Sequence, residues 1–156
     1  AEKAVGLISP RFGKKVKKTV SAFSFLAGCE VEDMDEFLAE EIARHPGLPE
    51  HQVRYLASNY GTEMDQVISL AEENTEWAEV LNADGEIAAQ VVYAIRNEMA
   101  MTLGDIVFRR TGLATLGNPG LPLLEKVAAI AGNELGWDKH RTRNEIDHVL
   151  DKFIYE

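Results

Sequence analysis

Signals that start and stop helices alternate along most of this chain, and they constrain its fold more than any other feature. Residues that cap helix N-termini, such as Asp33, Thr102 and Asp138, each precede a run with apolar residues three and four positions apart. Glycine or proline closes such runs, for example at Pro46 and Gly136. The period-two alternation that marks a half-buried strand is missing. The sequence therefore predicts an all-α fold, a compact bundle of about six or seven short helices.

The expected helices can be placed by these signals. The run at residues 87–99 is the most apolar, with Met99 among its apolar residues, so we expect it to form the centre of the core. A short helix capped by Thr102 with Asp105 should lead toward residues 109–110. The expected starting positions are, in chain order, Asp33, Pro49, Thr62, the turn 82–85, Thr102, the loop 117–120 and Asp138.

The first 28 residues differ from the remainder. Apolar residues near the start have the pattern of the last turns of a helix, which Ser9 and Pro10 end. The apolar stretch at residues 20–28 is predicted to be an extended connector that packs onto the core through Phe23, Phe25 and Leu26. We therefore expect residues 1–28 to be a connector and residues 29–156 to be the helical domain.

The charges limit the kinds of partner. The chain has 16 Lys and Arg against 26 Asp and Glu, a net charge of −10 at pH 7, and this argues against nucleic-acid binding because phosphate contacts need a positive surface. A basic block at residues 11–18, which includes Lys14 and Lys18, precedes an acidic block at residues 30–41. Four interpretations of the basic block stay open: a solvated surface, compensation by the acidic block, an anionic membrane face, or an acidic partner.

The single cysteine and the hydropathy pattern bear on the cellular setting. Cys29 has no second cysteine with which to form an internal disulfide, which favours a reduced cytoplasmic compartment. No stretch approaches the roughly 18 consecutive apolar residues of a membrane-spanning helix. We expect a cytoplasmic protein, with peripheral contact to the cytoplasmic membrane face as an alternative, and homo-oligomerisation stays open.

Motifs of the common catalytic centres are missing. The sequence has no GxGxxG after a strand, no GxxxxGK[ST], no HExxH and no GxSxG. His140 and His148 would stand about 12 Å apart along a helix, too far to share one metal ion. All four histidines are interpreted as structural or surface residues: His45, His51, His140 and His148. The chain by itself thus offers no predicted catalytic, cofactor-binding or metal-binding residue.

One long pattern stands out between residues 87 and 111. Its spacing is Y-A-x-R-x-E-x-A-x-T-L-x-D followed by R-R-T, and its members are Tyr93, Arg96, Glu98, Ala100, Thr102, Leu103, Asp105, Arg109, Arg110 and Thr111. This pattern resembles the C-terminal domain of the FAD-dependent glycerol-3-phosphate dehydrogenases. Residues 53–63 are similar to another element of that family, H-L-x-x-R-Y-G-x-E, so the resemblance covers about residues 50–150. The sequence departs from the family pattern at Asn59, Gly104, Phe108, Gly112 and Leu113.

The resemblance implies that the chain is part of a flavoenzyme. The family oxidises glycerol 3-phosphate to dihydroxyacetone phosphate with FAD and passes the electrons to quinone or to oxygen. Its flavin and substrate sites lie mainly in an N-terminal domain, so residues 1–28 would connect residues 29–156 to a flavin domain upstream. That flavin domain of the same chain is then the main partner, and FAD is the cofactor of the parent enzyme rather than of this fragment. The fragment alone is expected to be inactive, because the flavin carries the hydride chemistry.

Three arginines within the pattern are the candidate docking or anion contacts: Arg96, Arg109 and Arg110. Arg109 and Arg110 fall at the end of an expected helix, where the helix dipole favours cations, and Arg96 can form an ion pair on its own helix. Arginine binds carboxylate and phosphate equally well through paired hydrogen bonds. Capping or inter-helix pairing, docking on the flavin domain, and contact with an anionic substrate or lipid therefore all stay open.

Two other functions are compatible with a helical bundle. The chain could be a free-standing helical adaptor that binds another protein in a groove, or a peripheral membrane module that uses the basic residues 14–18. Among these alternatives, the accessory domain of a flavoenzyme is the one that explains the long pattern.

Overall fold

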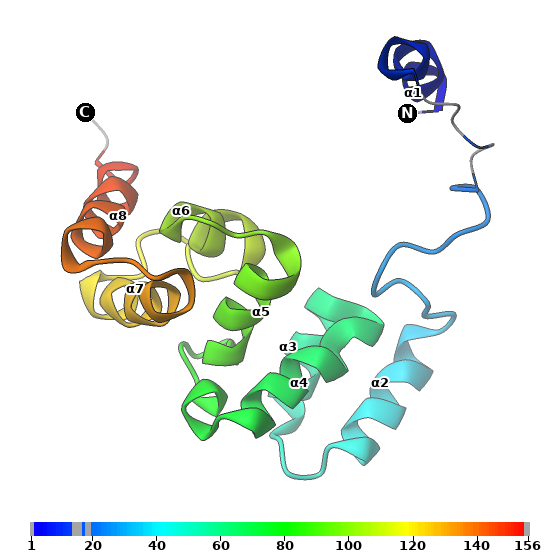
Figure 1. The fold of residues 1–156 in the computed structure, drawn as a ribbon. Helices are drawn as coiled ribbons and strands as arrows, with labels where there is room; N and C mark the ends of the chain where they lie inside the picture. The colour runs from blue at the N-terminus through cyan, green and yellow to red at the C-terminus, as the bar shows by residue number, and fades with distance from the viewer. Residues whose placement is uncertain (1, 14–16, 18–19, 155–156) are drawn as a thin grey trace.

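The computed structural model describes residues 2–13, 17 and 20–154. In this part of the chain the regular structure is helical apart from one isolated antiparallel bridge between Val80 and Ile87 (Figure 1). The α-helices are α1 (Glu2–Ile8), α2 (Met34–Arg44), α3 (Glu50–Tyr60), α4 (Met64–Glu73), α5 (Ala88–Glu98), α6 (Leu103–Asp105), α7 (Leu121–Leu135) and α8 (Lys139–Asp151). Tighter 3-10 turns cover Ser9–Phe12, Gly61–Glu63 and Thr75–Ala78, and a π-turn covers Ile106–Arg110. The predicted all-α bundle is confirmed.

Side-chain caps fix the starts of three helices where the sequence predicted them. Asp33 accepts hydrogen bonds from two backbone amides in the first turn of α2, at 2.9 and 3.0 Å. At α6, Thr102 Oγ1 accepts from the Asp105 amide at 3.0 Å, and Asp105 Oδ2 accepts from the Thr102 amide at 3.1 Å. Asp138 caps α8 in the same way, at 2.7 Å. Each cap satisfies backbone donors that the helix itself leaves unpaired.

The start of α4 differs from the prediction. Thr62 caps no helix; it lies in the 3-10 turn Gly61–Glu63 between α3 and α4, and α4 has no side-chain cap. The cause is a contact with an earlier segment, because the Thr62 amide donates to the carbonyl oxygen of Gly28 at 3.2 Å. Gly61 has a φ of 52°, and a Cβ there would lie 1.8 Å from that carbonyl oxygen, so only glycine fits. A tertiary contact thus sets the corner between α3 and α4.

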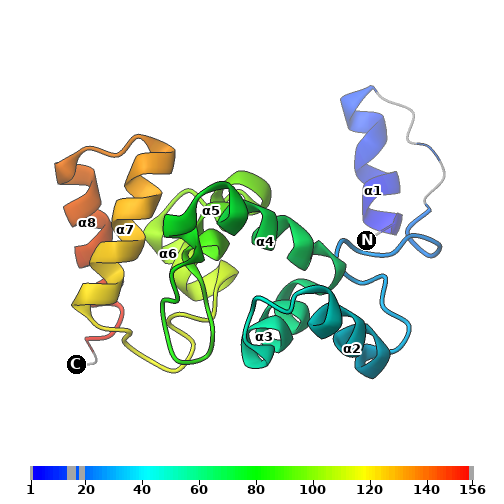
Figure 2. The same cartoon turned by 90° about the horizontal axis from the view of Figure 1, so that it is seen from below.

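Two apolar clusters share α5, which lies between α3 and α4 on one side and α7 and α8 on the other (Figures 1 and 2). The N-terminal cluster is built by α2 to α5 and includes Leu38, Val53, Leu56, Met64, Val67, Ile87 and Tyr93. The C-terminal cluster is built by α5 to α8 and includes Val91, Leu103, Ile106, Leu124, Val127 and Ile146. The expectation that residues 87–99 supply the centre of the core is confirmed for the buried positions of α5.

The segment before α2 packs less than predicted. Phe23, Phe25 and Leu26 are 91%, 70% and 77% exposed, so the prediction that they pack onto the core is wrong. The physical reason is that side chains from α2 to α5 already fill the N-terminal cluster. Helix α1 stands apart from the remaining helices (Figures 1 and 2), and its described side chains are largely exposed.

Most of the predicted basic block falls outside the described residues, since Lys14, Lys15 and Lys18 are not among them.

Of the helices that are described, none has the length and apolar character needed to cross a membrane.

Candidate functional site

The three candidate arginines do not converge on one site. Arg96 lies in the last turn of α5, whereas Arg109 and Arg110 end the π-turn after α6. Arg96 Nε and Nη2 donate to the two carboxylate oxygens of Glu134 on α7, at 2.7 and 2.9 Å. Its guanidinium group also lies 4.9 Å from the centre of the Trp77 ring. Arg96 therefore links α5 to α7 and to the turn Thr75–Ala78 within the domain.

Arg109 and Arg110 are more accessible. Arg109 forms an ion pair with Asp105 one turn earlier, yet its side chain is 73% exposed. Arg110 Nη1 lies 3.9 Å from Glu98 Oε1, and its side chain is 46% exposed. The second carboxylate oxygen of Glu98 is buried and has no hydrogen-bond partner among the described residues. Burial raises the pKa of Glu98, and the nearby Arg110 opposes that shift.

Apolar side chains are exposed beside these arginines. Met99, Met101 and Phe108 are 84%, 59% and 42% exposed. Met99, which the sequence predicted to be part of the apolar core helix, is exposed because it ends α5 with a φ of 61°, and the left-handed backbone turns the chain out of the helix. We call Met99, Met101, Phe108, Arg109 and Arg110 the α6 surface. Exposed large apolar groups next to arginine are typical of a surface that contacts another protein or domain.

A groove of about 790 Å³ lies next to the α6 surface, between α6 and α8. Four of its lining residues are Arg109, Arg141, His148 and Lys152. Arg141 pairs with Glu145 at 2.6 Å, and Glu145 also accepts a hydrogen bond of 2.9 Å from the first backbone amide of α6. The arginine and lysine side chains around this groove suit the binding of a carboxylate or phosphate group.

A buried carboxylate holds the loop that follows Arg110. Glu86 is 1% exposed, and it accepts hydrogen bonds from the Asn82 side chain and from the Gly112 amide. Burial raises the pKa of Glu86, and its hydrogen bonds, first that of Tyr55, act in the opposite direction. A Cβ at residue 112 would lie 2.7 Å from Tyr55 Oη and 3.1 Å from Glu86 Oε1. A larger residue at this position would therefore displace the ends of the Tyr55 and Glu86 side chains.

Sequence reasoning missed this anchor, although two signals pointed to it. A charged residue, Glu86, directly precedes the most apolar helix of the chain, and Gly112 departs from the family pattern. The two positions are 26 residues apart, so no local rule of helix capping connects them.

The described residues do not fit a flavin-binding site. Enzymes that hold a dinucleotide cofactor place its pyrophosphate on a glycine-rich turn between a strand and a helix. The described part of the chain contains no strand that could precede such a turn. No step of flavin chemistry is therefore assigned to these residues.

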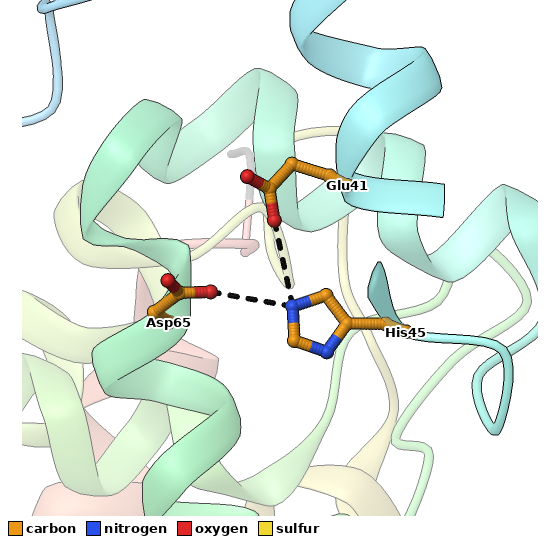
Figure 3. Close-up of side chains that lie close together, drawn as sticks. All are labelled: Glu41, His45 and Asp65. Carbon is orange, nitrogen blue, oxygen red and sulfur yellow. Dashed lines mark hydrogen bonds and ion pairs between the residues drawn. The ribbon is translucent and has the colours of Figure 1, made fainter. Parts of the chain in front are cut away.

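One group of side chains has the composition of a metal site. Glu41 and His45, from the end of α2, face Asp65 in the first turn of α4 (Figure 3). His45, which the sequence analysis interpreted as a structural or surface residue, thus lies between two carboxylates.

Known sequences similar to this chain come from enzymes of glycerol phosphate oxidation. Residues 20–142 match the family described as the C-terminal domain of alpha-glycerophosphate oxidase. A protein of Dictyostelium discoideum named as a probable mitochondrial glycerol-3-phosphate dehydrogenase is 31% identical over 110 residues, which are 70% of this chain and 17% of that protein. A glycerol-3-phosphate dehydrogenase of Synechocystis is 31% identical over 108 residues, 68% of this chain and 19% of the relative.

An alpha-glycerophosphate oxidase of Lactococcus lactis is similar over nearly the whole chain. The two are 27% identical over 155 residues, which are 96% of this chain and 25% of the oxidase. The chain thus spans between 17% and 25% of the length of these three relatives.

Proposed function

Because this chain belongs to the family of C-terminal domains of alpha-glycerophosphate oxidase, we propose that it is the accessory domain of a larger flavoenzyme that oxidises glycerol 3-phosphate. The product is dihydroxyacetone phosphate, and the electrons pass from FAD to quinone or to oxygen. The observation that carries this proposal is the family match over residues 20–142 together with the small share of each relative that the chain covers. The domain packs on the flavin domain of the same chain and has no activity alone.

The α6 surface is the face that docks on the flavin domain. It combines exposed apolar side chains with two arginines, and the basic groove between α6 and α8 adjoins it. Arg109 and Arg110 are only partly engaged by Asp105 and Glu98, so both retain donors for a carboxylate on a partner domain. Arg96 has a different role, because Glu134 and Trp77 already occupy its guanidinium group.

The test of the activity uses the product of the whole open reading frame. We expect the purified protein to show a flavin absorption spectrum that bleaches when glycerol 3-phosphate is added without oxygen. The present chain, purified alone, should be colourless and inactive under the same conditions. A colourless product no longer than this chain would contradict the proposal and favour a free-standing helical adaptor.

The test of the docking face compares charge reversals in the whole enzyme. The double variant Arg109→Glu with Arg110→Glu should release flavin at a lower temperature, because two docking contacts are replaced by like charges. The matched control reverses Arg54 and Arg143, which are similarly exposed and pair with carboxylates one turn away. Equal flavin-release temperatures for the two double variants would show that the α6 surface is not the docking face.

We also place the parent enzyme in the cytoplasm, with the basic block at residues 11–18 in contact with an anionic membrane face. Basic clusters bind such surfaces by about 1 kcal/mol per cation, and salt screens the attraction. Co-sedimentation of the whole enzyme with anionic vesicles should therefore fall as salt is raised, and salt-independent binding would contradict this contact.

A further inference from the structure

Three metal-ligand side chains converge where the end of α2 meets the start of α4 (Figure 3). His45 Nε2 lies 3.4 Å from Glu41 Oε2 and 3.2 Å from Asp65 Oδ1. The three potential ligand atoms all lie within 4.8 Å of one another. Glu41 and His45 are one helical turn apart, and Asp65 arrives from a different helix, so the cluster joins two elements.

One oxygen of the Glu41 carboxylate is not satisfied by the described protein groups. The residue is 1% exposed, and its Oε2 atom is buried with no hydrogen-bond donor among the described residues. A buried oxygen without a donor costs about 1–3 kcal/mol, and more when it is charged. The Nε2 atom of His45 carries at most one hydrogen, and it lies closer to Asp65 Oδ1 than to Glu41 Oε2. One hydrogen cannot serve both carboxylates, whereas a single cation placed among the three atoms contacts all of them.

Arg44 orients the two carboxylates by contacting the oxygen of each that does not face His45. Its Nη2 atom lies 2.8 Å from Glu41 Oε1, and its Nη1 atom lies 2.8 Å from Asp65 Oδ2. The remaining oxygens, Oε2 and Oδ1, are thereby directed at His45. Hydrogen bonds of this kind to the outer oxygens are how proteins position metal-binding carboxylates. Two carboxylates and one arginine sum to a net charge of −1, so a divalent cation is still attracted.

We propose that Glu41, His45 and Asp65 bind one divalent transition-metal ion, with Zn²⁺ as the best fit, and that the ion fastens α2 to α4. Bonds of about 2.0–2.2 Å in tetrahedral geometry place neighbouring ligand atoms about 3.3–3.6 Å apart, close to the 3.4 and 3.2 Å separations around His45 Nε2. An imidazole ligand favours zinc over calcium or magnesium, which prefer oxygen ligands. The Asp65 side chain is 51% exposed, which leaves a route for the ion and a place for a water as fourth ligand.

The site is structural in character. Its ligands come from the end of α2 and the start of α4, two of the helices that build the N-terminal cluster, and binding of an ion to the folded state alone stabilises that state by mass action. The inference is independent of the flavoenzyme proposal, since neither the ligands nor their geometry depend on the parent enzyme.

The test is a titration of the metal-free chain with ZnCl₂, followed by calorimetry and by thermal unfolding. We expect one Zn²⁺ per chain and a rise in Tm at saturating metal. The variants His45→Gln and Asp65→Asn should each weaken binding at least tenfold and remove the rise in Tm. The matched control is His51→Gln, which changes an exposed histidine on α3 and should bind as the unaltered chain does.

A second readout guards against misfolded variants. Co²⁺ in place of Zn²⁺ should give the visible absorption bands of a four-coordinate site in the unaltered chain and in His51→Gln, and not in Asp65→Asn. Far-UV circular dichroism of each metal-free variant shows whether it is folded before metal is added. If Zn²⁺ leaves the Tm of the unaltered chain unchanged, or binds His45→Gln equally well, the cluster is an ion-pair network and the proposal is wrong.

Discussion

At the scale of single residues, three buried or half-buried carboxylates differ in the hydrogen bonds and cations that compensate their charge. Glu86 accepts hydrogen bonds from a side chain and from the Gly112 amide, and Glu145 accepts one from a backbone amide and pairs with Arg141. Glu98 has only the distant Arg110, and one of its oxygens has no donor among the described residues. Protein groups therefore compensate the charge of Glu98 less well than those of Glu86 and Glu145.

The pH dependence of the variant Glu98→Gln tests that statement. Because burial raises the pKa of Glu98 in the folded state, its protonated form is favoured there, and this contribution to stability is complete below the ordinary pKa of about 4.3. It is lost as the pH rises through the folded pKa. The unaltered chain should therefore lose free energy of unfolding relative to Glu98→Gln as the pH rises from about 4 through the folded pKa, by about 1.4 kcal/mol for each pKa unit of the shift.

Urea unfolding of both proteins at several pH values measures this difference. The control is Glu50→Gln, whose carboxylate is 60% exposed and pairs with Arg54. A stability gap between the unaltered chain and Glu98→Gln that stays constant across this pH range would contradict the prediction.

At the scale of the elements, α6 depends strongly on its cap because it is a single short turn followed by a π-turn. Burial acts to raise the pKa of Asp105, but hydrogen bonds from Thr102, Met101 and Arg109 outweigh it and lower the pKa below its usual value. The Asp105 carboxylate is thus held as an anion at the start of the helix, where the helix dipole also favours negative charge.

Thr102→Ala should lower the free energy of unfolding by about 1 kcal/mol, the usual effect of losing a threonine cap. The matched control is Thr62→Ala, because Thr62 begins no helix and caps nothing, so this change should have a much smaller effect. Denaturant titrations of the two variants give the comparison, and equal losses of stability would show that the cap is not the cause.

The elements also show how far the sequence determines this structure. Helices with local caps, at Asp33, Thr102 and Asp138, were predicted at the right residues because the interactions span only a few positions. The start of α4 was not predicted correctly, because it depends on the contact between Gly28 and Thr62, which are far apart in the sequence. The contact of Glu86 with Gly112 and the approach of Asp65 to His45 were not predicted for the same reason, because both depend on how whole helices pack.

At the scale of the whole molecule, the two clusters should unfold together because α5 contributes to both. Val91 belongs to the C-terminal cluster, whereas Tyr93, two residues later, belongs to the N-terminal cluster. If one cluster unfolded alone, the side of α5 that it buries would be exposed to water. The unfavourable free energy of that exposure makes the two clusters unfold together.

The two tryptophans report on this coupling, because Trp77 packs against the N-terminal cluster and Trp137 against the C-terminal cluster. In Trp137→Phe the fluorescence follows Trp77, and in Trp77→Phe it follows Trp137. In each variant we expect the denaturant midpoint from fluorescence to equal that from far-UV circular dichroism. Midpoints that separate within one variant would mean that the halves unfold independently.

The close approach of Gly28 to the corner between α3 and α4 has a mechanical consequence. A Cβ at Gly28 would lie 2.4 Å from the carbonyl oxygen of Tyr60, so two backbones touch there, and the Thr62 amide bonds to Gly28. Tension that enters through residues 20–27 reaches this contact before it reaches α2. A force applied to residues 20–27 therefore acts on the corner between α3 and α4 first, and this contact shields α2 from that force.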